Sequence, residues 1–372
     1  MDNFPLYKYV LRRGLFWYYL ESSDLVPKVE KESQPICAPI YTGLRTNLLF
    51  RVSYYKCRVN LEMFHVLSDG AGAIKFLRAL IFNYLTLLYK ERFADVVLSS
   101  DASSISELMD DSYNRHYIDR KTFREMAKKE KRQIKVNAYK IHGTRTDEYR
   151  LSLIEGSMSV KAVLNEAHKY NTTLTVYITS LYIYSIYKTM SGRKKDQPIV
   201  LTVPVNLRQF FESHTGRNFF GTIHIGYNFA KNPDDLKLII KSIADGFKSN
   251  LNVEKLNLQL YKAMTAERNP FARLLPLPIK DFFIRTAVKT YDKYTTSNIS
   301  NIGRIELPPE FCEFIRQFSV CTSVRKPQLT MCSYNDRLVI SISSPFKEME
   351  IQRTFFQMLS KAGIDIEITS NL

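Results

Sequence analysis

The chain lacks the cysteine spacings that mark zinc sites and disulfide-stapled domains. It has five cysteines in 372 residues, an odd number, and no two of them form a CxxC pair. The cysteines are scattered: Cys37, Cys57, Cys312, Cys321 and Cys332. We therefore expect no metal site, no disulfide framework, and a reducing compartment, the cytoplasm.

The sequence also lacks a secretion signal and a long uncharged apolar run. A short apolar cluster near the N-terminus has none of the architecture of a signal peptide, and Glu21 and Asp24 follow it directly. The longest apolar-rich stretch, residues 172–187, contains Thr, Ser and Tyr throughout and is too short to cross a bilayer comfortably. This stretch predicts a buried helix instead.

Acidic side chains are few relative to basic ones. There are 37 Asp and Glu against 53 Lys and Arg, which gives a formal net charge of +16. Such a chain attracts anions, whether nucleic acid, anionic lipid or a phosphate-bearing cofactor, although a solvated basic surface is the commonest explanation. The basic residues concentrate between Lys121 and Arg145, where Glu125 and Glu130 interrupt them. No nucleic-acid motif accompanies this run, so we predict a charged linker and no nucleic-acid partner, and peripheral contact with an anionic membrane stays open.

The remaining composition indicates a large globular α/β protein. Apolar residues make up 45 % of the chain, enough for a sizeable core, and the length suggests two domains or one two-lobed unit. Residues 1–100 predict strands followed by one strong helix, and residues 101–135, with weak periodicity, predict a polar connector, with partial helix as an open alternative. Further strands are predicted near 136–142, 149–155, 198–205, 221–229, 337–344 and 364–369, and helices over 159–170, 173–190, 233–250, 255–268, 279–294 and 348–362.

The most informative motif is the hexapeptide HVLSDG, residues 65–70, placed where a strand gives way to a helix. Residues 56–65 alternate between polar and apolar, which is the pattern of a half-buried strand. His65 continues the apolar face, so its imidazole is expected to point inward at the end of that strand. After the motif, apolar residues recur at helical spacing.

Two interpretations of this motif compete. In the structural one, His65 is a satisfied core residue, and Ser68 or Asp69 caps the helix by accepting from its free backbone N–H groups. Gly70 and Gly72 then supply φ values that other residues avoid. In the functional one, His65 is a general base and the nearby carboxylate holds the local geometry. The motif alone does not decide between them.

Three later segments bear on that choice. Residues 203–208 read VPVNLR, residues 215–221 read TGRNFFG, and residues 297–303 read SNISNIG. Together with HVLSDG, and in this order, they resemble the chloramphenicol acetyltransferase-like superfamily of HxxxDG acyltransferases and peptide-synthetase condensation domains. The bacterial alcohol acetyltransferase-like branch is the most similar.

This resemblance implies a fold and a domain organisation. The fold is α/β, with two similar lobes that each hold a mixed sheet flanked by helices, and with an active-site tunnel between them. Residues 1–135 would form the N-terminal lobe with the motif and the basic connector, and residues 136–372 the C-terminal lobe. Relatives usually begin with a further strand and helix, so the resemblance implies that the N-terminal lobe of this chain is incomplete.

The resemblance also implies a reaction. His65 would act as the general base that takes a proton from an alcohol or amine while this acceptor attacks an acyl thioester. The donor would be acyl-CoA, used as a co-substrate, or a carrier-bound pantetheine thioester, and no cofactor would be permanently bound. Many relatives carry two consecutive histidines, whereas Phe64 precedes His65 here.

The other site residues are implied to have supporting roles. Asp69 would turn away from the substrate and pair with an arginine of the second lobe, for which Arg208 is the candidate, with Gly70 in the turn. Asn218, Ser300 and Asn301 are candidates for tunnel or oxyanion contacts. The competing hypothesis is a catalytically inactive, condensation-like binding module that keeps the fold.

Overall fold

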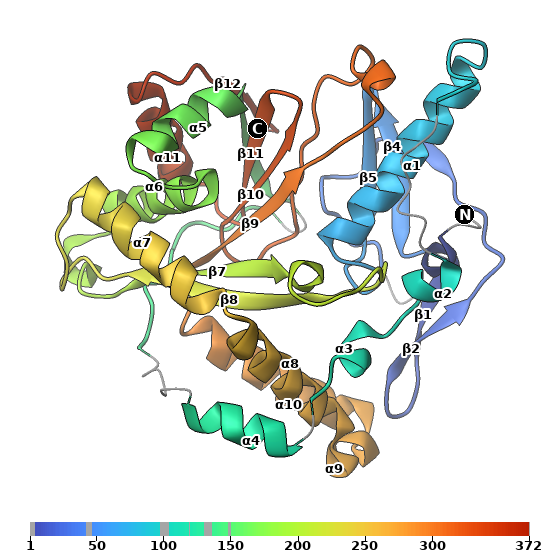
Figure 1. The fold of residues 1–372 in the computed structure, drawn as a ribbon, viewed down its shortest axis with the longest axis horizontal. Coiled ribbons are helices and arrows are strands. Elements are labelled where there is room, and N and C mark those ends of the chain that lie inside the picture. Colours follow the sequence, from blue (N-terminus) through green and yellow to red (C-terminus); the bar gives the residue numbers. More distant parts are fainter. Residues whose placement is uncertain are drawn as a thin grey trace.

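The computed structural model describes residues 4–41, 47–96, 104–118, 120–129, 136–147 and 150–371. The strands of these residues form a seven-stranded, a three-stranded and a two-stranded sheet. Figure 1 shows the large sheet with its helices on one side of the molecule and the two small sheets with a long helix on the other.

The seven-stranded sheet holds every strand after residue 150 and is mixed. Its order is β12-β6-β11-β10-β9-β7-β8. Strand β9 runs parallel to both β7 and β10, and the other pairs are antiparallel. The strands are β6 (Ser152–Ser159), β7 (Ile199–Asn206), β8 (Phe220–Tyr227), β9 (Ser297–Arg304), β10 (Gln328–Tyr334), β11 (Arg337–Ser344) and β12 (Glu367–Ser370).

Helices cover this sheet and complete the largest core. They are α5 (Val160–Lys169), α6 (Leu174–Thr189), α7 (Leu236–Asn250) and α11 (Glu350–Lys361). Helix α6 packs against both α7 and α11 and is buried around most of its circumference, as its apolar, hydroxyl-rich sequence predicted. This buried helix and the continuous apolar strand β7 contribute many of the side chains in that core.

The N-terminal part is built from shorter elements. Strands β1 (Tyr9–Arg13) and β2 (Tyr18–Ser22) form an antiparallel hairpin. Strands β3 (Val29–Lys31), β4 (Phe50–Tyr55) and β5 (Arg58–Met63) form a second mixed sheet, in which β3 is parallel and β5 antiparallel to β4. Their core centres on the stacked rings of Tyr7 and Phe76, 4.0 Å apart, with Phe50 edge-on to both.

Helix α1 (Gly70–Leu88) joins the two parts of the molecule. By length and composition it is the one helix among the described residues that could cross a membrane. Several of its apolar side chains are nevertheless used in packing, although Leu87 and Leu88 at its end are exposed. Phe76 belongs to the N-terminal core, while Ile74, Leu77 and Ile81 pack against the cluster around Ile305 and Cys332. The helix is therefore best explained as a junction between the lobes.

The connector is more ordered than a solvated linker. It contains α2 (Ile105–Leu108), α3 (Ser112–Arg115) and α4 (Arg120–Lys129), and it docks on α8 (Val253–Arg268). Phe123 stacks on Tyr261 at 4.0 Å, and the Arg268 guanidinium lies 4.1 Å from the Tyr117 ring centre. A partly helical connector is thus confirmed, whereas the charged linker predicted from Lys121 onward was wrong over residues 121–129, because aromatic side chains interleave with the charges. Residues 130–135 of the basic run and the predicted lobe boundary at 135 lie outside the described residues.

Two local predictions were also wrong. Residues 136–142 form no strand, because their backbone hydrogen bonds are made to different segments rather than to one neighbouring strand. Ala138 N donates to Lys293 O, and Tyr139 N donates to Pro198 O. Helix α7 was predicted from residue 233 but begins at Leu236, where its cap is Asp235, which accepts from Leu238 N at 3.0 Å. The α/β class with mixed sheets flanked by helices is confirmed.

Candidate active site

His65 lies in the turn between β5 and α1. The strand ends at Met63, so His65 does not continue its apolar face, and the expected inward imidazole is wrong: the residue is exposed. Its ring stands 5.6 Å from the ring of Phe220, measured between centres. Within the described part of the chain, neither imidazole nitrogen has a hydrogen-bond partner, so both are available to a ligand.

Asp69, by contrast, is fully engaged and 6 % exposed. It is the N-cap of α1, where its Oδ1 accepts from Gly72 N at 3.1 Å. Its Oδ2 accepts from Phe219 N at 2.9 Å and from Arg208 Nη1 at 2.8 Å. A carboxylate that accepts three hydrogen bonds inside the protein is an anchor rather than a second acid–base group.

Arg208 supplies the other half of this anchor. It lies just after β7, in a short 3₁₀ turn (Leu207–Gln209), and its side chain is 10 % exposed. Its guanidinium also donates to Thr215 O at 3.0 Å and to Arg217 O at 2.5 Å, within the loop before β8. The planar guanidinium therefore holds the motif to a loop of the large lobe, the lobe that contains the seven-stranded sheet. This contact is the ion pair that the resemblance implied.

The same loop reaches the backbone beside His65. Asn218 Nδ2 donates to His65 O at 2.8 Å, and Ser68 Oγ donates to Gly216 O at 2.6 Å. The buried Asn218 Oδ1 has no partner in the described structure. The turn that carries the histidine is thus hydrogen-bonded to the large lobe at His65 and at Ser68.

The two glycines of the motif serve close approach rather than unusual φ values. Neither is among the described glycines with positive φ, which are Gly303 and Gly363. A Cβ on Gly72 would overlap Ser68 Oγ and stand 2.6 Å from Gly216 O, and one on Gly70 would stand 2.9 Å from Ile302 Cδ1. The expected reason for these glycines was wrong, because Ser68 of the motif and two residues of the large lobe occupy the space that their side chains would need.

Strand β9 reaches the motif through an irregularity. Asn301 pairs with Met331 and Gly303 with Cys332, so Ile302 is an extra residue in a bulge. Gly303 has φ +88°, which a side chain would disfavour. The SNISNIG segment therefore contributes an apolar contact from Ile302 to the start of α1.

The predicted oxyanion candidates differ in what they touch. Asn301 donates to Thr175 Oγ1 at 2.9 Å and accepts from Gly303 N at 2.8 Å, so it ties β9 to the start of α6. The amide of Asn218 is engaged by the histidine turn. The Ser300 hydroxyl, half-buried in β9, makes no hydrogen bond with the described residues. Of these three side chains, only that of Ser300 makes no hydrogen bond with the described residues.

Two tyrosines beside the site were missed by sequence reasoning, and no motif marks them. Tyr7 donates to Gly72 O at 3.3 Å, and Tyr113 donates to Phe220 O at 2.7 Å. Burial raises the pKa of both hydroxyls, Tyr7 most strongly, so both stay neutral donors. Tyr7 therefore fastens the N-terminal segment to the first turn of α1, and Tyr113 fastens the connector to the start of β8.

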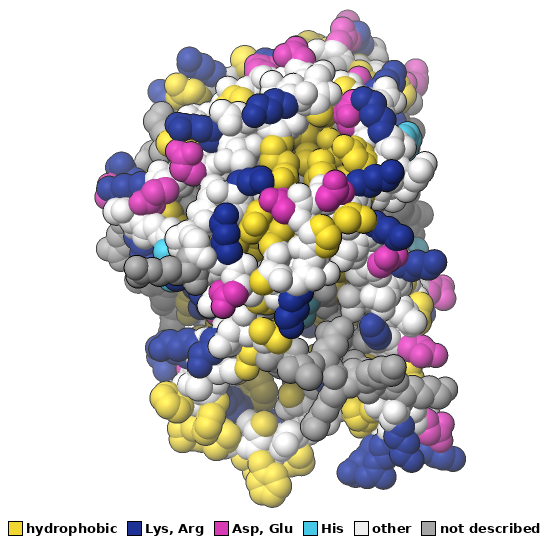
Figure 2. Space-filling model, turned by 90° about the vertical axis from the view of Figure 1, so that its left-hand side faces the viewer, with side chains coloured by type: hydrophobic (Ala, Val, Ile, Leu, Met, Phe, Trp, Pro, Cys, Tyr) yellow, Lys and Arg dark blue, Asp and Glu magenta, His cyan; other side chains and the backbone are white. Residues whose placement is uncertain are grey.

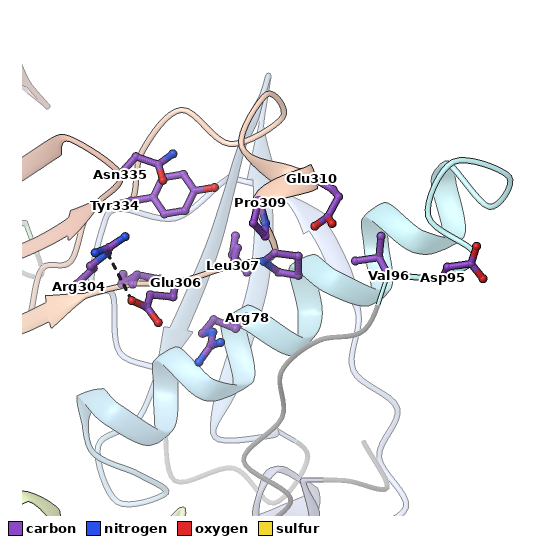
Figure 3. Close-up of a pocket in the computed structure, with 12 residues that line it drawn as sticks. Arg78, Asp95, Val96, Arg304, Glu306, Leu307, Pro309, Glu310, Tyr334 and Asn335 are labelled. Atoms are coloured by element: carbon purple, nitrogen blue, oxygen red, sulfur yellow. Dashed lines mark ion pairs between the residues drawn. The ribbon is translucent and has the colours of Figure 1, made fainter.

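A cavity of about 390 Å³ opens farther along α1, as Figure 3 shows. Arg78 of α1 faces it from one side, and Arg304, paired with Glu306, from another. His65 lines neither this cavity nor a smaller one beside Tyr7 and Gly216. The tunnel implied by the resemblance therefore stays a prediction.

Comparison with known proteins defines the fold. No protein-family model and no curated protein matches the sequence. Among solved structures, the epimerization domain of tyrocidine synthetase B superposes with a TM-score of 0.59 at 12 % identity, over 96 % of this chain and 85 % of that one. Polyketide synthase associated protein 5 from Mycobacterium tuberculosis gives 0.57 at 12 % identity, over 95 % and 86 %.

A third similar structure is a mutant starter condensation domain of rhizomide synthetase in complex with C8-CoA and Leu-SNAC. It superposes with a TM-score of 0.58 at 13 % identity, over 97 % of this chain and 83 % of that one. These similarities extend over nearly the whole chain and agree with the fold that the resemblance implied. The chain therefore has the same two-lobed α/β fold as these condensation and epimerization domains.

Proposed function

We propose that this chain is an acyltransferase that moves an acyl group from a CoA or carrier-bound pantetheine thioester to an alcohol or amine. The observation that carries the proposal is the contrast between the surroundings of Asp69 and those of His65, within the same motif. Asp69 is buried and held by three hydrogen bonds, whereas His65, in the same turn, is exposed with both ring nitrogens available. In this proposal the lobes are residues 1–135 and 136–372.

His65 then works as a general base. Its unprotonated nitrogen takes the proton of the acceptor O–H or N–H while that oxygen or nitrogen attacks the thioester carbonyl carbon. The C–S bond breaks, the ester or amide remains, and the departing thiolate takes the proton back from the imidazolium. General-base help of this kind contributes about 10²–10⁴-fold to the rate.

The anchor has a positioning role in this reaction. The bond from Asn218 to His65 O and the pair of Asp69 with Arg208 hold the histidine turn against the large lobe. Ser300 is our candidate donor to the developing oxyanion, because its hydroxyl is free whereas the amides of Asn218 and Asn301 are engaged. The net charge of +16 favours a donor with phosphate groups.

Two similar structures support this class of chemistry by what they are. One is a wax ester synthase/diacylglycerol acyltransferase from Marinobacter aquaeolei VT8, with a TM-score of 0.53 at 13 % identity over 96 % of this chain. The other is the condensation domain in complex with C8-CoA described above.

The second candidate function is an inactive binding module of the same fold. It is favoured by the position of His65, which is exposed and lines neither described cavity. Such a module would bind the thioester donor without turning it over.

One experiment separates the two functions. The purified chain is offered acetyl-CoA and longer acyl-CoA esters with a panel of alcohols and amines, and acylated products are measured by mass spectrometry. The enzyme hypothesis expects product from the wild type and a fall of about 10²–10⁴-fold in kcat for His65→Ala. The matched control is His142→Ala, an exposed histidine outside the motif, which should keep full activity. Wild-type turnover that His65→Ala leaves intact contradicts the assigned base. Acyl-CoA binding by calorimetry without turnover favours the inactive module.

A further inference from the structure

A large apolar surface lies at the lower end of the molecule, away from the histidine turn. It is formed by the tip of the β1–β2 hairpin, by α9 (Pro270–Leu274) and by the first half of α10 (Leu277–Asp292). Figure 2 shows hydrophobic side chains gathered at the end where Figure 1 draws α9 and α10. The most exposed members are Leu15, Phe271, Leu274, Phe282, Phe283 and Ile284, between 59 % and 83 % accessible.

These three elements form one surface because they are fastened to each other. Leu277 N donates to Leu15 O at 2.9 Å. The buried ammonium of Lys280 donates to Phe16 O at 2.8 Å and lies 3.5 Å from the ring centre of Trp17. The hairpin tip is therefore held on the first turn of α10, and its apolar residues continue those of the helix.

The composition of this surface is unusual for water-exposed structure. Leu15, Phe16 and Trp17 occupy a hairpin tip, where small polar residues are the rule. Monomeric soluble proteins rarely expose contiguous apolar patches larger than a few hundred Å². The patch needs a partner, and its shape and charge indicate which one.

The shape favours a fluid partner. Phe282, Phe283 and Ile284 are consecutive on a helix with 3.6 residues per turn, so they fan over more than half of its circumference. A rigid protein groove would have to encircle such a helix to cover all three side chains. Fluid acyl chains can adapt to side chains that point in several directions.

The charges and aromatic residues favour an anionic lipid surface. Around the apolar residues stand four exposed cations, Arg13, Arg273, Arg285 and Lys289, while the half-buried Asp281 accepts from Tyr18 OH at 3.5 Å. Trp17, Tyr18 and Tyr19 flank the hairpin tip and are each partly exposed. Tryptophan and tyrosine concentrate at the membrane–water boundary, and each nearby cation adds attraction to anionic headgroups.

We propose that the hairpin tip, α9 and α10 form a surface that docks on an anionic phospholipid bilayer, with the apolar side chains inserted among the headgroups and acyl ends. The chain then lies on the membrane without crossing it. This proposal does not depend on the acyltransferase assignment.

Trp17 provides a direct test, because it is the only tryptophan in the chain. The purified full chain is titrated with phosphatidylcholine vesicles that contain or lack phosphatidylserine, and tryptophan emission and co-sedimentation are followed. We expect a blue shift and co-sedimentation with the anionic vesicles, both weakened by added salt. No blue shift and no co-sedimentation with the anionic vesicles overturns the proposal.

A variant pair localises the contact. Phe282→Ser with Phe283→Ser removes two exposed rings and should weaken vesicle binding at least about tenfold without lowering the melting temperature. The matched control is Leu87→Ser with Leu88→Ser, at the exposed end of α1, where the two leucines are 67 % and 54 % accessible. An equal loss in the control, or a dimer in solution that the phenylalanine variant abolishes, overturns the membrane assignment.

Discussion

The ion pair between Asp69 and Arg208 offers the sharpest test of how the two lobes are held together. Replacing Arg208 by alanine removes the donor at 2.8 Å and leaves a carboxylate that is 6 % exposed with two backbone N–H partners. It also releases the carbonyls of Thr215 and Arg217. Breaking a buried pair in this way costs about 3–5 kcal/mol, most of it because the remaining charge stays buried.

The assay is equilibrium denaturation of the wild type, Arg208→Ala, Asp69→Asn and the double variant. Asp69→Asn should also destabilise, because an amide can satisfy the cap at Gly72 or the donors on the other side, but not both. The double variant should lose less stability than the sum of the single variants, by about 0.5–3 kcal/mol, because the unpaired charge is gone.

A surface ion pair serves as the control. Arg353 pairs with Glu350 at 3.0 Å, with both side chains more than 60 % exposed, and Arg353→Ala should cost less than about 0.5 kcal/mol. Equal losses for Arg208→Ala and Arg353→Ala, or strictly additive effects in the cycle, would refute the reasoning.

Three further predictions concern two glycines and a pair of cysteines. Gly72→Ala should lower the free energy of unfolding by about 1–3 kcal/mol in chemical denaturation, since its Cβ would overlap Ser68 Oγ and stand 2.6 Å from Gly216 O, whereas Gly192→Ala, with open space around it, should change little. Gly303→Ala meets no neighbour but requires φ +88°, so it should cost about 1–2 kcal/mol for conformational reasons alone, and a neutral effect would contradict the bulge. The Cys37 and Cys321 sulfurs lie 4.0 Å apart, and the hydrogen bond with Cys321 lowers the pKa of the Cys37 thiol, so diamide should link these two first; peptide mapping that finds another pair would contradict this.

Local sequence patterns were informative wherever one element decides its own structure. The helix of residues 174–189 and the strand of residues 199–206 were predicted nearly to the residue, because their apolar content and flanking prolines and caps are local signals. Strand β9 was not predicted as a strand. Its sequence, SNISNIGR, is polar for a strand, and it is held in place by β7 and β10 on either side.

The sequence by itself determined the order of the motifs, a helix cap at Ser68 or Asp69 and the class of fold, since each depends on residue types at fixed spacing. Only the tertiary structure decided what surrounds them. It selected Asp69 as the cap and placed Arg208 on it across 139 positions of chain. It turned His65 outward, and it explained Gly72 by the closeness of Ser68 Oγ and of a carbonyl of the other lobe. It also gathered a hairpin tip and a helix more than 250 residues apart into one apolar surface. Contacts of this kind depend on how the lobes pack, and no local pattern records that packing.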